Sequence, residues 1–364
     1  MIRVGIIGCG RMADQHLRQI RRIRGAQVVA ACDAELLMAG QLAERFSIPY
    51  CFDSVSAMLT AGGLDVVHVT TSPASHFALA RQCLESGVHV YIEKPFTLIA
   101  SEAIELVRLA ESRSLKLTAG HNAQFTPAML RMRELIDAGR IGGRPVHLES
   151  HYCYSLGDAA YATAVLSDRE HWVRQLPGSL LQNIISHGIS KIAEFVTGDA
   201  PRVTARGFTS TFLRDIGQSD IIDEVRVIIE DEAQMTAYFT FSSQIAPPPH
   251  RLQVFGRRGS ILVDEDHQVV VIEDDKEYKS YLAYFVPPLR QARQYSAAFF
   301  RNAGAFIRRD FHLPNDAGLK TLIDRFYRCI EGQGALPLSY REIIVTARIM
   351  DDIFAQVRGG HESA

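Results

Sequence analysis

The amino-acid sequence predicts an α/β protein in which an N-terminal domain with a doubly wound parallel sheet precedes a second domain. Short Val/Ile-rich runs alternate with helical patterns through the first third of the chain, and a strand with regular apolar/polar alternation follows in the second half. Nearly continuous apolar strands between helices are typical of a parallel sheet covered on both faces. At 364 residues the chain is long enough for about two domains with separate cores.

Composition and charge are those of a globular protein, with 47% hydrophobic residues, 22% charged residues and a net charge of −2. We therefore expect no nucleic-acid partner. The densest basic group, residues 18–24, ends the first helical pattern, where positive charge complements the negative helix terminus.

The six cysteines are spread out and form no C-x-x-C pair, which predicts buried free thiols in a reducing compartment. The sequence starts directly with a strand pattern and has no apolar run long enough to span a bilayer. We therefore expect a cytoplasmic protein with no membrane partner. We also expect no metal, because the 13 histidines are dispersed.

The elements of the first domain follow from this alternation. Strands are expected at RVGIIG, QVVAACD, LDVVHVTT, HVYIEK and LKLTAGH. Helices are expected at about residues 12–23, 36–46, 74–86 and 101–112, with another after Pro127.

The first strand ends in GCGRMA, which places Gly8, Gly10 and Ala13 on the pattern G-x-G-x-x-G/A. Gly8 permits the tight turn, Gly10 lets the backbone approach a pyrophosphate, and Ala13 keeps the helix close to the strand. The motif follows a strand and opens a helix, so it predicts a dinucleotide-binding Rossmann domain in which Arg11 and Met12 also line the cofactor.

Asp33 ends the second strand, 20 residues after Ala13. A carboxylate at this place can accept hydrogen bonds from ribose hydroxyls and would repel a 2′-phosphate, and the next residues, Ala34 and Glu35, provide no arginine for that phosphate. NAD is therefore favoured over NADP. The alternative role for Asp33 is the N-cap of the following helix.

Two more strand ends carry polar residues. TTSPASH lies at the end of the expected strand LDVVHVTT, and YIEKPF lies at the end of the expected strand HVYIEK. Ligands of parallel sheets bind beyond the carboxyl ends of the strands, so Thr71, Pro73 and His76 are expected at the cofactor, with packing as the alternative for His76 and Pro73. Glu93 and Lys94 are expected there too, although a lone strand-end lysine is more typically a surface residue.

The segment GSLLQNIISHGISKIAEFVTG, residues 178–198, predicts one amphipathic helix. Its polar stripe consists of Asn183, His187, Ser190, Lys191 and Glu194. Taken alone, such a stripe is typical of a solvated helix face.

In the second domain, AQMTAYFTFS alternates regularly and predicts an antiparallel strand with one face packed on helices. The expected buried face consists of Ala233, Met235, Ala237, Phe239 and Phe241. Before it, a polar, aromatic-rich stretch from Tyr161 to Trp172 predicts a substrate loop or an oligomer contact. A helix is expected near residues 339–357.

The order of GCGRMA, TSPASH, EKP, HNAQFTPAM and GSLLQNIISH resembles the glucose-fructose oxidoreductase / inositol dehydrogenase / MocA (Gfo/Idh/MocA) family, and DEVRVIIEDEAQMTAYFTFS and LQVFGRRGSILVD resemble its second domain. The resemblance implies a Rossmann NAD(P)-binding domain over residues 1–123. It also implies an α+β domain with an open, mostly antiparallel sheet over residues 124–364, for substrate binding and assembly into a homodimer or homotetramer.

The resemblance further implies hydride transfer between a nicotinamide and a carbinol or carbonyl carbon of a sugar, nucleotide-sugar or cyclitol. Lys94 matches the lysine that contacts the reacting oxygen, and His187 matches the histidine that donates or accepts its proton. Asn183 stands where many members have an aspartate, so a relay that needs a carboxylate there is in doubt. Asn122 and Trp172 complete the expected substrate contacts.

In this family the polar stripe of the histidine helix would face a cleft, with Asn183 and His187 at the substrate and Lys191 near the rim. A nucleotide-linked or free hexose is the first choice of substrate, because Tyr152, Tyr154 and Tyr161 could enclose a large sugar. Two alternatives remain: a relative that retains NAD during glycoside cleavage, and a sugar or dinucleotide sensor without turnover.

Overall fold

The computed structural model describes residues 1–156, 166, 168, 170–307 and 318–359. Their contacts define two compact units. The N-terminal unit comprises Met1–Asn122 and Gly318–Arg348, and the C-terminal unit comprises Ala123–Ala317 and Ile349–Ala364. One segment differs from the domains expected from the sequence: residues 318–348, expected in the second domain, pack with the first because α13 (Leu319–Ile330) buries its apolar face there.

The N-terminal unit contains a six-stranded sheet with the order β3-β2-β1-β4-β5-β6, and every strand pair is parallel. The strands are β1 (Ile2–Ile7), β2 (Ala26–Cys32), β3 (Tyr50–Phe52), β4 (Val66–Val69), β5 (His89–Ile92) and β6 (Leu117–Ala119). This confirms the predicted parallel sheet. The order reverses between β1 and β4, which makes their carboxyl ends the topological switch point.

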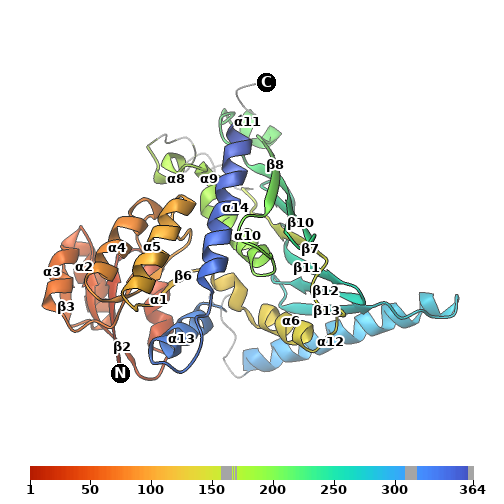
Figure 1. Cartoon of the computed structure of the whole chain (residues 1–364), viewed down its shortest axis with the longest axis horizontal. Coiled ribbons are helices and arrows are strands. Elements are labelled where there is room, and N and C mark those ends of the chain that lie inside the picture. The colour runs from red at the N-terminus through yellow and green to blue at the C-terminus, as the bar shows by residue number, and fades with distance from the viewer. Residues whose placement is uncertain (157–165, 167, 169, 308–317, 360–364) are drawn as a thin grey trace. The chain divides into compact units, whose positions relative to one another are not determined.

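Helices accompany these strands (Figure 1). They are α1 (Arg11–Ile20), α2 (Leu36–Phe46), α3 (Val55–Ala61), η1 (Pro73–Ser75), α4 (His76–Glu85), α5 (Ala100–Ser112) and α13. The sequence patterns did not predict β3 and α3, which are short. Ser54 is the N-cap of α3, and its hydroxyl accepts a hydrogen bond from the Ala57 N–H at 3.4 Å. α1 and α13 lie side by side.

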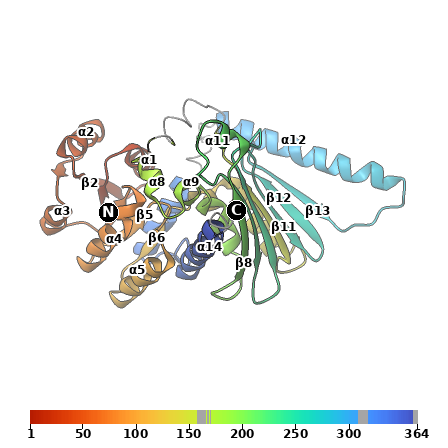
Figure 2. The same ribbon diagram turned by 90° about the horizontal axis from the view of Figure 1, so that it is seen from above.

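The C-terminal unit contains a seven-stranded sheet with the order β13-β12-β11-β7-β10-β9-β8 (Figure 2). The strands are β7 (His147–Tyr152), β8 (Arg202–Phe208), β9 (Glu224–Glu230), β10 (Thr236–Ser242), β11 (His250–Gly256), β12 (Gly259–Asp264) and β13 (Val269–Asp274). Only the central pair β7 and β10 is parallel. The expected mostly antiparallel sheet is confirmed.

The alternation in β10 holds, although the strand begins later than expected. Ala237, Phe239 and Phe241 are buried, whereas Tyr238 is exposed. The strand starts at Thr236 rather than 233 because the Asp231 carboxylate accepts hydrogen bonds from the backbone N–H groups of Ala233 (2.9 Å) and Met235 (2.8 Å), which forms a turn.

The helices of this unit are α6 (Pro127–Asp137), α8 (Trp172–Gln175), α9 (Ser179–Ile184), α10 (Ser186–Ala193), α11 (Thr211–Asp215), η3 (Leu282–Tyr284) and α12 (Val286–Ile307). η2 (Asn122–Phe125) and α14 (Tyr340–Gly359) each run from one unit into the other. α12 covers the edge strand β13, where the Gln294 amide bonds both the N–H (2.8 Å) and the carbonyl (3.0 Å) of Ile272.

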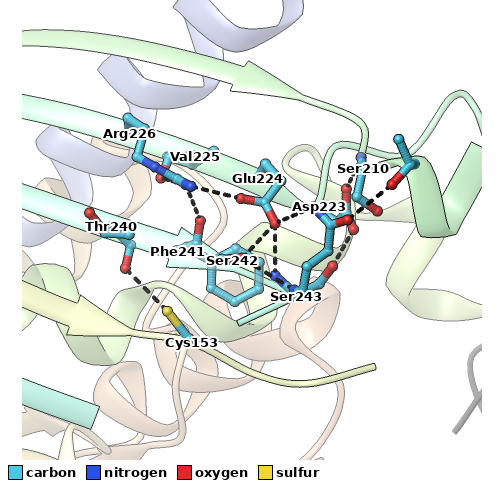
Figure 3. Close-up of polar contacts among 12 residues, drawn as sticks. Cys153, Ser210, Asp223, Glu224, Val225, Arg226, Thr240, Phe241, Ser242 and Ser243 are labelled. Carbon is cyan, nitrogen blue, oxygen red and sulfur yellow. Dashed lines mark hydrogen bonds and ion pairs between the residues drawn. The ribbon is translucent and has the colours of Figure 1, made fainter. Parts of the chain in front are cut away.

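A carboxylate network joins β9 and β10 near Ser210 (Figure 3). Glu224 accepts hydrogen bonds from the Ser242 hydroxyl (2.6 Å) and the Ser243 N–H (3.2 Å), and pairs with Arg226 at 2.9 Å. The neighbouring Asp223 accepts from the Ser210 N–H at 2.6 Å. These contacts satisfy two buried carboxylates with fixed donors, which is the condition for burying charge.

The cysteines match the expectation of free, mostly buried thiols. All six cysteines are free; five are buried and Cys51 is exposed. Within the part of the chain that the structure describes, no helix combines the length and apolar character that a bilayer crossing requires.

Candidate active site

The expected cofactor residues of the N-terminal unit gather at one edge of its sheet. The carboxyl ends of β1, β2, β4 and β5 carry the glycine-rich loop, Asp33, the Thr71–His76 region and the Glu93–Lys94 pair, respectively. Because β1 and β4 are neighbours on opposite sides of the strand-order reversal, this edge is where open α/β sheets bind ligands.

The glycines of the first loop meet different requirements. Gly8 has φ +90°, and an added Cβ would lie 2.6 Å from Thr71 Cγ2 and 2.8 Å from the Thr71 nitrogen, so the fold itself requires glycine. An added Cβ at Gly10 would meet no protein atom within 4 Å. Gly10 is also the N-cap of α1, which no side chain caps, and Arg11 and Met12 follow in the first turn. This arrangement fits a pyrophosphate at the helix N-terminus.

Asp33 anchors the loop from the neighbouring strand. One carboxylate oxygen accepts the Cys9 N–H at 2.7 Å, and the other accepts the Glu35 N–H at 3.0 Å. The alternative N-cap role is wrong, because Glu35 holds that position of α2. Half-buried at the end of β2, Asp33 fits the carboxylate that binds the ribose of a dinucleotide.

His76 connects the segments that follow β4 and β5. Its ring nitrogens lie 2.9 Å from the Pro95 carbonyl and 3.1 Å from the Thr71 carbonyl. The side chain is fully buried, which lowers its pKa. Pro73 is buried as well and begins η1. These contacts fix the backbone of both segments; contact of Thr71, Pro73 or His76 with a cofactor stays a prediction.

Glu93 and Lys94 follow β5 directly. The buried Glu93 carboxylate accepts a hydrogen bond from His16 Nε2 (2.8 Å) and one from the Lys94 backbone N–H (3.1 Å). Burial raises the pKa of Glu93, but the hydrogen bond and the charge of His16 outweigh it, so this pKa lies below its usual range. An added Cβ at Gly120 would lie 2.8 Å from the Glu93 carboxylate.

Burial acts on Lys94 in the opposite sense. It lowers the pKa of the half-buried Lys94, and the charge of Glu93 opposes part of that shift. The Lys94–Pro95 peptide is cis. A lysine with a lowered pKa at the carboxyl edge of a nucleotide-binding sheet is a candidate for chemistry at a bound substrate.

The sequence pattern predicted one continuous histidine helix over residues 178–198, but the structure has two helices there. α9 and α10 are separated at Ile185, where the Gly188 N–H bonds the Ile185 carbonyl at 3.0 Å, a three-residue step. Asn183 lies in α9, His187 lies in the first turn of α10, and both side chains are half-buried.

Gly188 fixes the position of His187 on the sheet. An added Cβ there would lie 2.3 Å from the Phe239 ring and 2.9 Å from Tyr152 Cβ, and the Ser150 hydroxyl donates to the Gly188 carbonyl at 3.2 Å. α10 therefore packs closely on β7 and β10. The His187 ring lies 5.2 Å from the Tyr152 ring.

The expected position of Lys191 near a rim is wrong. Lys191 is fully buried, forms an ion pair with Glu265, and places its ammonium 4.9 Å from the Tyr152 ring centroid. The polar stripe of this helix is not a solvated face either. Ser190 is buried, and Glu194 forms a bidentate ion pair with Arg133 at 2.5 and 2.8 Å. Both sides of α10 pack against protein.

The sequence patterns did not identify Gln124 of η2, a residue that holds α10 in place. Gln124 is buried, and its amide donates to the Ser190 carbonyl at 2.5 Å, while Arg133 donates to the Gln124 carbonyl at 2.6 Å. The signal available in the sequence was a glutamine between Asn122 and a helix N-cap, Thr126.

Two further substrate candidates lie at the starts of short helices. Asn122 is half-buried at the start of η2. Trp172 starts α8 with 42% exposure, and its ring lies 5.8 Å from that of His171. Their contacts with a substrate stay predictions. Tyr161 lies outside the described residues. No group of three or more metal-ligating side chains occurs among the residues described.

Comparison with known families assigns a class to this architecture. The family model described as "Oxidoreductase family, NAD-binding Rossmann fold" matches residues 2–121, and the Gfo/Idh/MocA C-terminal domain matches residues 129–262. The protein is thus an oxidoreductase with an NAD-binding Rossmann domain. The chain belongs to the Gfo/Idh/MocA family, as its sequence motifs predicted.

Individual relatives are distant. The chain is 26% identical to the D-apiose dehydrogenase of Paraburkholderia graminis over 74% of this chain and 69% of the relative. It is 24% identical to the inositol 2-dehydrogenase of Rhizobium meliloti over 84% and 88%. The crystal structure of the WlbA dehydrogenase from Bordetella pertussis, in complex with NADH and UDP-GlcNAcA, shares the fold with a TM-score of 0.76 at 17% identity, covering 99% of this chain and 96% of that one.

Proposed function

We propose that the protein is an NAD-dependent dehydrogenase that oxidises a carbinol carbon of a sugar, nucleotide-sugar or cyclitol, or reduces the matching carbonyl. One observation carries the proposal: the glycine-rich loop, Asp33 and Lys94 share the carboxyl edge of one parallel sheet at its switch point. The residues proposed to bind the nucleotide and a lysine with a lowered pKa thus lie at one edge of one compact unit.

The roles of the two catalytic candidates follow from the needs of the reaction. Bound NAD would supply the hydride acceptor for the carbinol carbon. His187 takes the hydroxyl proton in oxidation and returns it in reduction, since an imidazole transfers protons near neutral pH. The Lys94 ammonium stabilises the negative charge that develops on the same oxygen.

The preference for NAD over NADP is part of this proposal. Asp33 supports it, because its carboxylate stands at the end of β2 and holds the loop through the Cys9 N–H. A 2′-phosphate at that place would meet a negative charge rather than an arginine.

The substrate class is supported by what the relatives act on. Their names cover D-apiose and inositol, and WlbA is bound to UDP-GlcNAcA. The tyrosine argument for a large sugar is weaker than the sequence suggested, because the Tyr152 ring packs against His187, whereas Tyr154 is 45% exposed. Asn183, Asn122 and Trp172 are the further substrate contacts that we propose.

The deciding experiment follows nicotinamide absorbance with NAD or NADP across free pentoses, hexoses, cyclitols and UDP-sugars, and with NADH and the matching ketosugars. A change with one compound, larger with NAD, is the expected result. Release of a free sugar without net NADH would contradict the proposal in favour of a glycosidase. Binding without turnover in both directions would contradict it in favour of a sensor.

We also infer a homodimer or homotetramer. The large side chains on the outer face of the seven-stranded sheet support it, with Phe208, Ile228 and Tyr238 each more than 40% exposed. The mass in solution tests this inference, and a monomer would contradict it.

A further inference from the structure

Four titratable side chains form a continuous buried chain in the N-terminal unit. Tyr327 of α13 lies 2.8 Å from His68 Nε2 on β4, and His68 Nδ1 lies 2.7 Å from His16 Nδ1 on α1. The chain ends where His16 Nε2 meets the Glu93 carboxylate at 2.8 Å. None of the family motifs in the sequence includes Tyr327 or His68.

The surroundings of this chain are apolar and aromatic. The Tyr91 ring stacks on His68 with the centroids 4.6 Å apart and stands edge-on to His16 at 5.0 Å. Phe326 packs on Tyr91 at 6.3 Å. The exposed fraction is 0% for both histidines, 2% for Tyr327 and 5% for Glu93. Hydrogen bonds in such an environment are strong, and an unsatisfied group is costly.

The proton positions in the chain are constrained. An ionised Glu93 can only accept, so His16 Nε2 carries the hydrogen of that bond. In the uncharged arrangement, the Tyr327 hydroxyl donates to His68 Nε2 and the His68 Nδ1–H donates to His16 Nδ1. If one proton is added to His16, its Nδ1–H donates to His68 Nδ1 and the His68 Nε2–H donates to the Tyr327 oxygen, while His16 still donates to Glu93. In either arrangement the chain stabilises the Glu93 anion.

The titratable groups that sense the charges of Glu93 and Lys94 include two histidines. His76 on α4 and His121 after β6 both sense the charge of Glu93, and His121 also senses that of Lys94. Burial lowers the pKa of His68, His76 and His121, and raises the pKa of Tyr91 and Tyr327. These five side chains are therefore neutral near pH 7.

We propose that Tyr327, His68 and His16 are positioning residues that hold Glu93 as an anion beside Lys94 and thereby keep the Lys94 ammonium charged during hydride transfer. The inference rests on the proposed function for the role of Lys94 in turnover. It assigns a function to α13. The polypeptide returns to the N-terminal unit with this helix almost two hundred residues after η2.

The sign of the effect is fixed by the charges. Burial lowers the pKa of Lys94, and the Glu93 charge opposes that shift. Weakening the hydrogen bond to Glu93 favours its neutral form, so the pKa of Lys94 falls further. If the ammonium is the active form, the alkaline limb of kcat moves to lower pH.

The test titrates Lys94 in the full-length protein without substrate, from the pH dependence of its acetylation rate measured peptide by peptide with mass spectrometry. Glu93→Gln should lower the apparent pKa of Lys94 most, His16→Asn by roughly one unit and Tyr327→Phe by about half a unit. The matched control is Tyr340→Phe, which removes another tyrosine hydroxyl of the same unit, bonded to the backbone of Leu117 and Leu115 at 3.3 Å. It should leave Lys94 unchanged.

With a substrate that the enzyme converts, the alkaline limb of kcat should shift to lower pH in the same order of variants. If Tyr327→Phe and His16→Asn lower Tm while the Lys94 titration stays at the wild-type value, the chain is only structural and the proposal is overturned. If Tyr327→Phe does not fold, His16→Asn decides. A shifted Lys94 titration in a protein that neither oxidises a sugar, nucleotide-sugar or cyclitol nor reduces the matching ketone would refute the proposed function and support the positioning role of Tyr327, His68 and His16.

Discussion

Each unit of the protein places a lysine near a buried glutamate, but the two pairs are connected in different ways. In the C-terminal unit, Lys191 binds the Glu265 carboxylate directly and is 0% exposed. In the N-terminal unit, the Glu93 carboxylate bonds His16 and the Lys94 backbone, and acts on the Lys94 ammonium through its charge. A direct buried pair fixes the ammonium as part of the core, whereas a glutamate held through imidazoles adjusts the protonation of a lysine at a ligand-binding edge.

The sharpest way to break this comparison is to remove the Lys94 ammonium. Lys94→Met should lower kcat by about 10³-fold or more, equivalent to roughly 4 kcal/mol of transition-state stabilisation. NAD binding and Tm should change little, since the methionine keeps much of the side-chain volume. Turnover with the best substrate, NAD affinity by fluorescence and Tm are the measurements. A variant with near-wild-type kcat would remove Lys94 from the chemistry.

The same substitution at Lys191 should give the reverse pattern. Lys191→Met leaves Glu265 buried without its cation, and the free energy of unfolding should fall by about 3 kcal/mol in urea titrations. The double variant Lys191→Met, Glu265→Leu should recover part of that loss, because no isolated charge is left. A stable Lys191→Met protein that has lost turnover would place Lys191 in the active site after all.

The smallest effect concerns the neutral histidines near Glu93. Burial lowers the pKa of His121 to about 4. The unfolded chain binds this proton near pH 6.5, so between pH 6.5 and 4 the unfolded state carries more protons and stability falls as pH decreases, by up to about 1.4 kcal/mol per pH unit. His121→Gln should flatten the dependence measured by urea unfolding at pH 7 and pH 5. His267→Gln, at a side chain with 73% exposure, is the control; equal slopes in both variants would argue against a neutral His121.

Local patterns predicted the nucleotide edge well. Gly8, Gly10 and Asp33 lie within one strand-helix-strand unit, so spacing alone determines their placement, and Lys94 follows β5 of the same parallel sheet. The partner of His68 could not be predicted, because Tyr327 is 259 residues away and α13 shows only an ordinary amphipathic pattern. Lys191 was misplaced because the whole polar stripe was assigned to one side of a helix facing a cleft, whereas α10 is enclosed by the sheet, Glu265 and Arg133.

The return of residues 318–348 to the N-terminal unit has a consequence for how the chain is made. A nascent chain that emerges from the ribosome as far as η2 lacks α13 and therefore lacks the cover over His16, His68 and Tyr91. The nucleotide-binding unit thus cannot finish folding before the unit that follows it in the chain has been synthesised, contrary to the usual N-terminal-first order. For the same reason, a fragment cut after residue 123 is an incomplete domain rather than a minimal one.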